Sequence, residues 1–66
     1  MRARTKLTRD QIGDEARRFG LSQHDLEELT TQTVGDEINI IVYPGNAQAL
    51  RFVEHLCSQK LATKTG

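Results

Sequence analysis

The feature that most constrains the fold is a short run of apolar and β-branched residues, Ile38–Tyr43, which ends at Pro44-Gly45. Such residues favour an extended strand, and a Pro-Gly pair favours a turn. Because alternate side chains of a strand point to opposite faces, both faces are substantially apolar: Ile38, Ile40 and Val42 on one, Ile41 and Tyr43 on the other. We expect such a strand to be covered within the chain, to pair with a second copy, or to add to the sheet of a partner protein.

Two helices with marked N-termini precede this strand. Thr8 and Gln11 have the spacing of a capping box, and Gly20 is placed to end the helix that they begin, which predicts a helix over Arg9–Phe19. Ser22 is placed to cap a second helix in the same way.

A third helix follows the strand, with Asn46 as its predicted cap. Its apolar residues recur at helical spacing and predict the main core helix of the domain. They are Leu50, Val53, Leu56, Cys57 and Leu61.

The segment 30–34 has two interpretations. Its β-branched residues can form a strand that turns at Gly35-Asp36 in a type II′ turn, with Gln32 opposite Asn39. Alternatively, the second helix continues to Val34. The chain is therefore expected to be a small single α+β domain, ordered α-α-β-α or α-α-β-β-α, with residues 8–62 compact, a basic arm at 1–7 and a frayed end at 63–66.

Charge is segregated along the chain although nine basic and nine acidic residues give a net charge of zero. The first nine residues carry +4 from Arg2, Arg4, Lys6 and Arg9, and residues 10–37 carry −6. A net charge of zero lacks the strongly basic balance of a typical nucleic-acid-binding protein. The single cysteine excludes an internal disulfide framework and indicates a cytoplasmic protein.

The candidate catalytic residues are few. His55 and Cys57 lie two positions apart on the third helix, about 200° around its axis, so they do not face each other as base and nucleophile. His24, His55 and Cys57 lack the spacing of a zinc site, and the chain has no phosphate-binding glycine motif. We therefore expect no enzymatic activity, no cofactor and no metal. The longest apolar run is too short for a membrane span, so no membrane partner is expected.

One segment, Phe19–Thr30, resembles the first turn and second helix of phage-repressor-type helix-turn-helix proteins, which often read G-L-S-Q-x-x-L at this point. The resemblance implies DNA binding. It covers about 12 of the 66 residues and ends where a recognition helix would follow, because Val34–Tyr43 is β-branched and contains Asp36 and Glu37.

These observations predict a small regulatory or inhibitory protein that binds another protein, of the kind that phages and plasmids encode. The expected partner-binding residues are Asp25, Glu27, Glu28, Ile41 and Tyr43. We also expect a homodimer through the strand residues Ile38, Ile40, Ile41 and Val42. The alternative is a dimeric helix-turn-helix-like DNA-binding regulator whose nucleic-acid contacts are Arg2, Arg4, Lys6 and Arg9.

Overall fold

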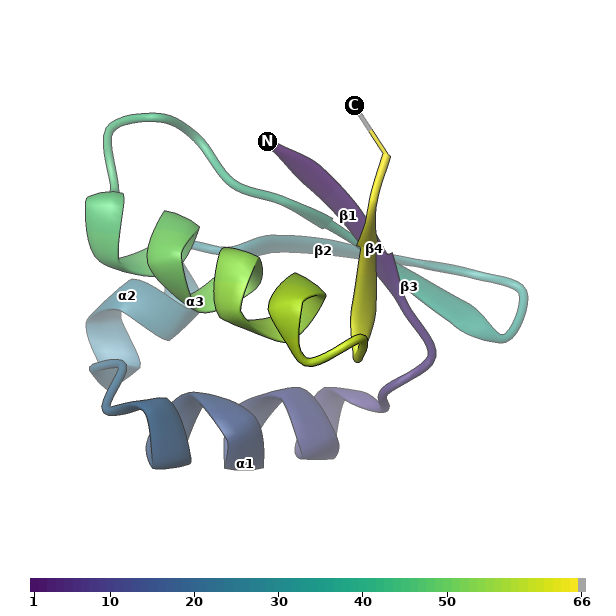
Figure 1. Ribbon diagram of the computed structural model, residues 1–66, viewed down its shortest axis with the longest axis horizontal. Helices are drawn as coiled ribbons and strands as arrows, with labels where there is room; N and C mark the ends of the chain where they lie inside the picture. Colours follow the sequence, from purple (N-terminus) through teal and green to yellow (C-terminus); the bar gives the residue numbers. More distant parts are fainter. Residues whose placement is uncertain (66) are drawn as a thin grey trace.

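The computed structural model describes residues 1–65, which form a four-stranded antiparallel sheet with the helices packed on one face (Figure 1). In chain order the elements are β1 (Arg2–Thr5), α1 (Arg9–Phe19), α2 (Gln23–Glu27), β2 (Thr30–Val34), β3 (Glu37–Ile41), α3 (Ala47–Ser58) and β4 (Ala62–Lys64). The strands are ordered β2-β3-β1-β4. This is the split β-α-β arrangement with α2 inserted before β2. The α+β class is confirmed, and the predicted α-α-β-β-α order forms the middle of the chain.

The hairpin interpretation of residues 30–34 is confirmed. Strand β2 pairs with β3 in the predicted register, with Gln32 opposite Asn39 and Val34 opposite Glu37. Gly35 has a φ of 64°, the positive value that the first central residue of a type II′ turn requires. Helix α2 ends at Glu27, so the alternative of a helix that continues to Val34 is wrong.

The predicted helix signals are also present. The Thr8 hydroxyl accepts a hydrogen bond from the Gln11 amide, and the Gln11 side chain accepts one from the Thr8 amide. Helix α1 ends at Gly20, whose φ of 93° is in the left-handed region. The Ser22 and Asn46 side chains cap α2 and α3.

The two ends of the chain differ from the expectation of a basic arm and a frayed terminus. Strand β1 lies inside the sheet between β3 and β4, where Ala3 and Thr5 are buried. Strand β4 includes Thr63 and Lys64, and the amide of Thr65 donates to the Arg2 carbonyl. The predictions for residues 1–7 and 63–65 are wrong because distant segments pair with each other. Residue 66 lies outside the described residues.

The core lies between one face of the sheet and the helices. On the sheet it includes the predicted inner face of the strand, Ile38, Ile40 and Val42. On α3 the buried residues are Ala49, Phe52, Val53 and Leu56. Phe52, which is fully buried, was not among the predicted core residues, whereas Leu50, Cys57 and Leu61, which were, only pack at the margin of the core.

Strand β3 is an interior strand, paired with β2 on one side and β1 on the other. Its backbone has no free edge for a second copy. The prediction that Ile38, Ile40, Ile41 and Val42 form a dimer strand is therefore wrong, and the free edges of the sheet belong to β2 and β4.

Candidate functional site

The backbone edge of β2 is the first component of the candidate site. Met1 and Val42 exchange both backbone hydrogen bonds, so the alternate residues of β3 direct their N–H and C=O groups toward β1 or toward β2. In this alternation Asn39 faces β2 and pairs with Gln32. The amides and carbonyls of Thr31 and Thr33 therefore point outward, away from the sheet.

The strand at this edge lacks the charged residues, proline and bulge that commonly protect an edge strand. Segment Thr30–Val34 contains no charged residue and no proline, and it pairs with β3 without a bulge. Lysine, proline and bulges are the common protections against pairing with another chain. The opposite edge strand, β4, is only three residues long. The β2 edge is therefore the better template for an added strand.

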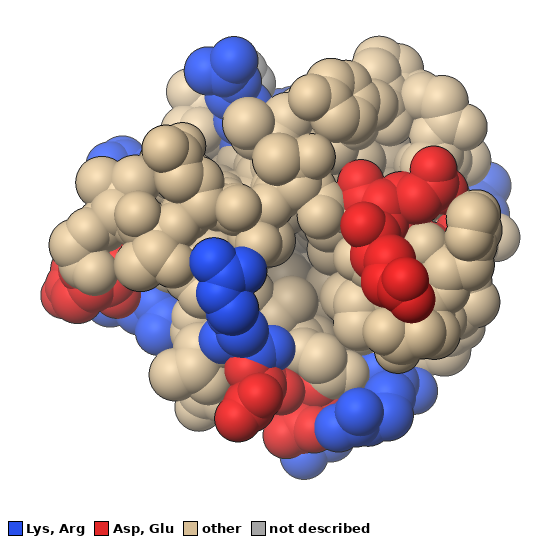
Figure 2. Space-filling model, turned by 180° about the vertical axis from the view of Figure 1, so that it is seen from behind, with Lys and Arg blue, Asp and Glu red and all other residues tan. Residues whose placement is uncertain are grey.

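An apolar depression of about 180 Å³ lies beside this edge, between α1, α2 and β2. Its lining residues are Arg9, Ile12, Gly13, Leu26, Glu27, Leu29 and Thr31. Figure 2 shows a depression near the middle of the rear face, between basic side chains and a group of acidic side chains. We name the depression between α1, α2 and β2 the edge depression.

Arg9 forms one wall of the edge depression. Its guanidinium group donates to the hydroxyl oxygens of Thr31, at 2.5 Å, and Thr33, at 3.1 Å. These side chains lie on the helix side of β2, because they are opposite the buried Ile40 and Ile38. Arg9 thus holds the first turn of α1 against the edge strand. Its predicted role in a flexible nucleic-acid-binding arm is not what the structure shows.

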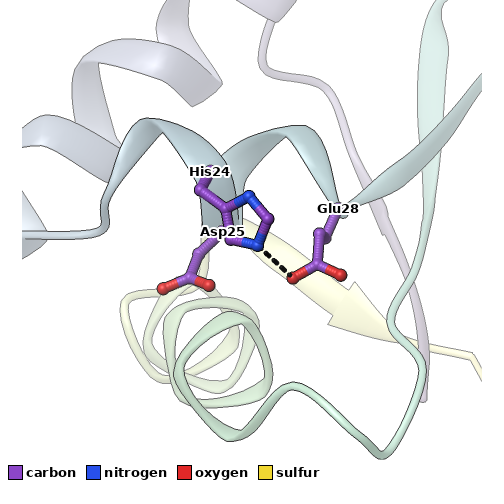
Figure 3. Close-up of side chains that lie close together, drawn as sticks. All are labelled: His24, Asp25 and Glu28. Atoms are coloured by element: carbon purple, nitrogen blue, oxygen red, sulfur yellow. Dashed lines mark ion pairs between the residues drawn. The ribbon is translucent and has the colours of Figure 1, made fainter.

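The predicted acidic residues lie together on or directly after α2. Nε2 of His24 is 3.3 Å from Oε1 of Glu28, and Figure 3 shows both side chains beside that of Asp25. Their ligand atoms all lie within 4.8 Å of one another, which is a geometry that could hold a metal ion. The third acid, Glu27, points elsewhere and lines the edge depression.

A side chain from the next loop already engages this acidic cluster. Nδ2 of Asn46 donates to Oδ1 of Asp25 at 3.0 Å and to Oε1 of Glu28 at 2.8 Å. Oδ1 of the same Asn46 caps α3 by accepting from the Ala49 amide. The two carboxylates therefore tie α2 to the start of α3, and a cation would have to displace this amide group.

The open face of the sheet, opposite the helices, carries the other predicted residues. Arg2 and Arg4 alternate with the buried Ala3 and Thr5, and Ile41 pairs with Arg2. A depression of about 290 Å³ lies here, lined in part by Arg2, Arg4 and Ile41.

The predicted partner residues do not form one surface. Ile41 is half-buried on the open sheet face, whereas Asp25, Glu27 and Glu28 are on the helix side. Tyr43 is 63% exposed in the loop that leads to Asn46. The β2 edge and the edge depression were not predicted from the sequence. The one sequence signal for them is a glycine, Gly13, in the interior of a well-capped helix.

The remaining predictions concern the helix-turn-helix resemblance of α2 and the side chains of His55 and Cys57 on α3. Helix α2 has only five residues and leads directly into β2, so residues 1–65 contain no recognition helix after it and the helix-turn-helix expectation does not fit. His55 packs its ring on Phe19, with centroids 5.2 Å apart. Cys57 is half-buried against the core, as expected for a small apolar side chain.

Comparison with known protein families, curated proteins and solved structures finds no match for this chain. Within residues 1–65, no helix has the length and apolar character that crossing a membrane would require.

Proposed function

We propose that this chain is a non-enzymatic regulatory or inhibitory protein that acts by binding another protein through the β2 edge. The observation that carries the proposal is an uncharged, unprotected edge strand beside an apolar depression. In β-strand addition, main-chain hydrogen bonds provide affinity and a pocket for alternate side chains provides specificity. The β2 edge and the edge depression offer these two components side by side.

The proposal is tested by capturing binding partners from a lysate of the source cells. The wild-type protein and two variants at position 33 are used as baits. Thr33→Pro removes an outward N–H that an added strand needs, while the bonds from β2 to β3 remain. Thr33→Val is the matched control, because it removes only the hydroxyl that accepts from Arg9. We expect wild type and Thr33→Val to capture the same protein and Thr33→Pro to lose it.

The folding of each variant is checked by a ¹H–¹⁵N correlation spectrum before capture. A partner that a folded Thr33→Pro variant retains would contradict binding through the edge. A nuclease-treated lysate run in parallel separates protein partners from proteins that are bridged by nucleic acid.

A second candidate function, nucleic-acid binding, is favoured by the open sheet face. Arg2 and Arg4 are both exposed there, and neither forms an ion pair within residues 1–65. Oδ1 of Asn39, opposite Arg4, is buried and lacks a hydrogen-bond donor. Two exposed arginines can contact phosphates, whereas the buried Asn39 oxygen is not accessible to a base.

This candidate is tested by fluorescence anisotropy with labelled single-stranded and duplex oligonucleotides at several salt concentrations. If the face binds nucleic acid, the double variant Arg2→Gln/Arg4→Gln should reduce the log–log salt slope by about one unit per lost phosphate contact. Equal binding by the wild type and the double variant would exclude this face. Arg17→Gln/Arg18→Gln, at two exposed positions of α1, is the control for loss of two positive charges.

A further inference from the structure

Gly13 is the unusual residue of the edge depression. It lies in the interior of α1, where glycine is less favourable than alanine because it loses more backbone freedom on folding. Its φ is not in the left-handed region, so the backbone conformation does not require glycine. A Cβ atom added there would meet nothing within 4 Å. No contact within residues 1–65 therefore explains why this residue is glycine.

The position of Gly13 relative to β2 suggests an explanation from outside the chain. Gly13 and Thr31 both line the edge depression, and the backbone of Thr31 points outward at the strand edge. A strand added to β2 would direct alternate side chains toward the helix side of the sheet. One of these side chains would lie over Gly13.

The size and lining of the edge depression fit an apolar side chain. An apolar cavity of about 150 Å³ can bind benzene, and the edge depression measures about 180 Å³. Ile12 and Leu29, which line it, are buried, and Leu26 is half-buried. A leucine, isoleucine or phenylalanine side chain would therefore fill it.

The charged residues at the rim of the edge depression set a second requirement for a partner segment. Glu27 lines the edge depression and is exposed, with one long contact of 3.4 Å from the Gln23 side chain. Arg9, on another wall, already donates to two threonine hydroxyls. Glu27 has no ion pair within residues 1–65 and favours a cation on the partner, while Arg9 keeps its positive charge, so we expect that cation on the Glu27 side of the edge depression.

We infer that the edge depression is a socket for one apolar side chain of an extended partner segment, with a lysine or arginine of that segment beside Glu27. Gly13 keeps the floor of this socket open at the expense of helix stability. The inference rests on the proposed binding through the β2 edge and specifies the chemistry of the partner.

A second copy of the chain fits this socket less well. If two β2 strands paired with each other, the side chains directed to the helix side would be Thr31 and Thr33. Both are polar, and both already accept hydrogen bonds from Arg9. A segment of another protein can instead place an apolar residue over Gly13.

The test titrates ¹⁵N-labelled protein with synthetic heptapeptides, followed by amide chemical shifts. Two peptides carry leucine at the fourth residue, threonine elsewhere, and a lysine either two residues before or two residues after the leucine, which covers both strand directions. A third peptide replaces the leucine with asparagine. We expect a leucine peptide to shift the amides of Gly13, Thr31 and Thr33, and the asparagine peptide to bind more weakly.

Substitutions at Gly13 separate the socket from the stability of the fold. Gly13→Ala should raise Tm by roughly 4 °C or more and weaken peptide binding roughly fourfold. Gly13→Leu should fill the socket and weaken binding roughly tenfold or more. Gly45→Ala is the matched control, because its added Cβ also meets nothing within 4 Å and it lies outside the edge depression. It should leave binding unchanged.

Each outcome has a distinct meaning. If Gly13→Leu binds the leucine peptide as the wild type does, the socket is wrong although the β2 edge stands. If no peptide shifts Thr31 or Thr33, both the socket and the proposed function fail. If these amides shift with protein concentration alone, the occupant is a second copy, which overturns the inference of a foreign segment.

Discussion

The hydroxyl of Thr5 donates a hydrogen bond of 2.6 Å to the carbonyl of Leu61, 56 residues further along the chain. The same oxygen accepts from the amide of Leu7 at 3.1 Å. Thr5 is buried in β1, so these two bonds fix the exit of β1 against the approach to β4. One side chain therefore joins the two ends of the domain.

Thr5→Val should destabilise the fold by about 1–3 kcal/mol, because it keeps the shape of the side chain but leaves a buried carbonyl and an amide without partners. In a domain of this size that loss lowers Tm by roughly 4–8 °C per kcal/mol. Thr63→Val, on the exposed part of β4, is the control and should change Tm little. Equal melting temperatures for the two variants would show that the Thr5 bonds contribute nothing.

The core prediction concerns Phe52, which is fully buried on α3 and packs against Phe19 with ring centroids 5.7 Å apart. Phe52→Ala should cost about 3–5 kcal/mol, comparable to the whole stability of a small domain. Leu50→Ala should cost clearly less, because Leu50 is only half-buried. Circular dichroism during urea unfolding checks the order, and a larger loss for Leu50→Ala would contradict this packing.

Lys60 provides a prediction of increased stability. It follows the end of α3 with a φ of 61°, a left-handed conformation that costs residues with a Cβ about 1–2 kcal/mol and that glycine adopts freely. Lys60→Gly should therefore stabilise the protein by about 1 kcal/mol. Lys60→Ala removes the same charge but keeps the strain, so it should not stabilise. If both substitutions increase the stability, the loss of the positive charge explains the increase, and relief of the left-handed conformation does not.

Asn46 links two helices, and its two functions can be separated. Asn46→Ala removes both the cap of α3 and the donors to Asp25 and Glu28, and should cost about 1–2 kcal/mol. Asn46→Asp keeps a good cap but places a third carboxylate beside the two acids. We expect it to be less stable than the wild type at neutral pH and to recover with added salt, which screens the repulsion. Thermal melts at two salt concentrations measure this.

Local features of the fold could be predicted from the sequence. The cap of α1, the Gly35 turn and the register of Gln32 with Asn39 depend on residues close together in the chain. The pairing of Arg2 with Ile41 could not be predicted in this way, because the two residues are far apart and β1 is short and polar. The pairing of Arg4 with Thr63 could not be predicted either, because these two residues are also far apart in the chain.

The core face of α3 and the candidate site were not predicted from the sequence for two different reasons. Phe52 was missed because the apolar stripe was centred on Leu50, although Ala49, Phe52, Val53 and Leu56 have the same helical spacing. The site depends on topology. Only the strand order shows that β2 is an edge and that Gly13 lies beside it.

Amide hydrogen exchange in β2, measured for the free protein and for its complex with the captured partner, tests whether binding occurs through the β2 edge. In the free protein we expect rapid exchange at Thr31 and Thr33, whose amides point outward, and slow exchange at Gln32 and Val34, which pair with β3. In the complex, Thr31 and Thr33 should become protected. Exchange at these two amides that stays rapid in the complex would contradict binding through the β2 edge.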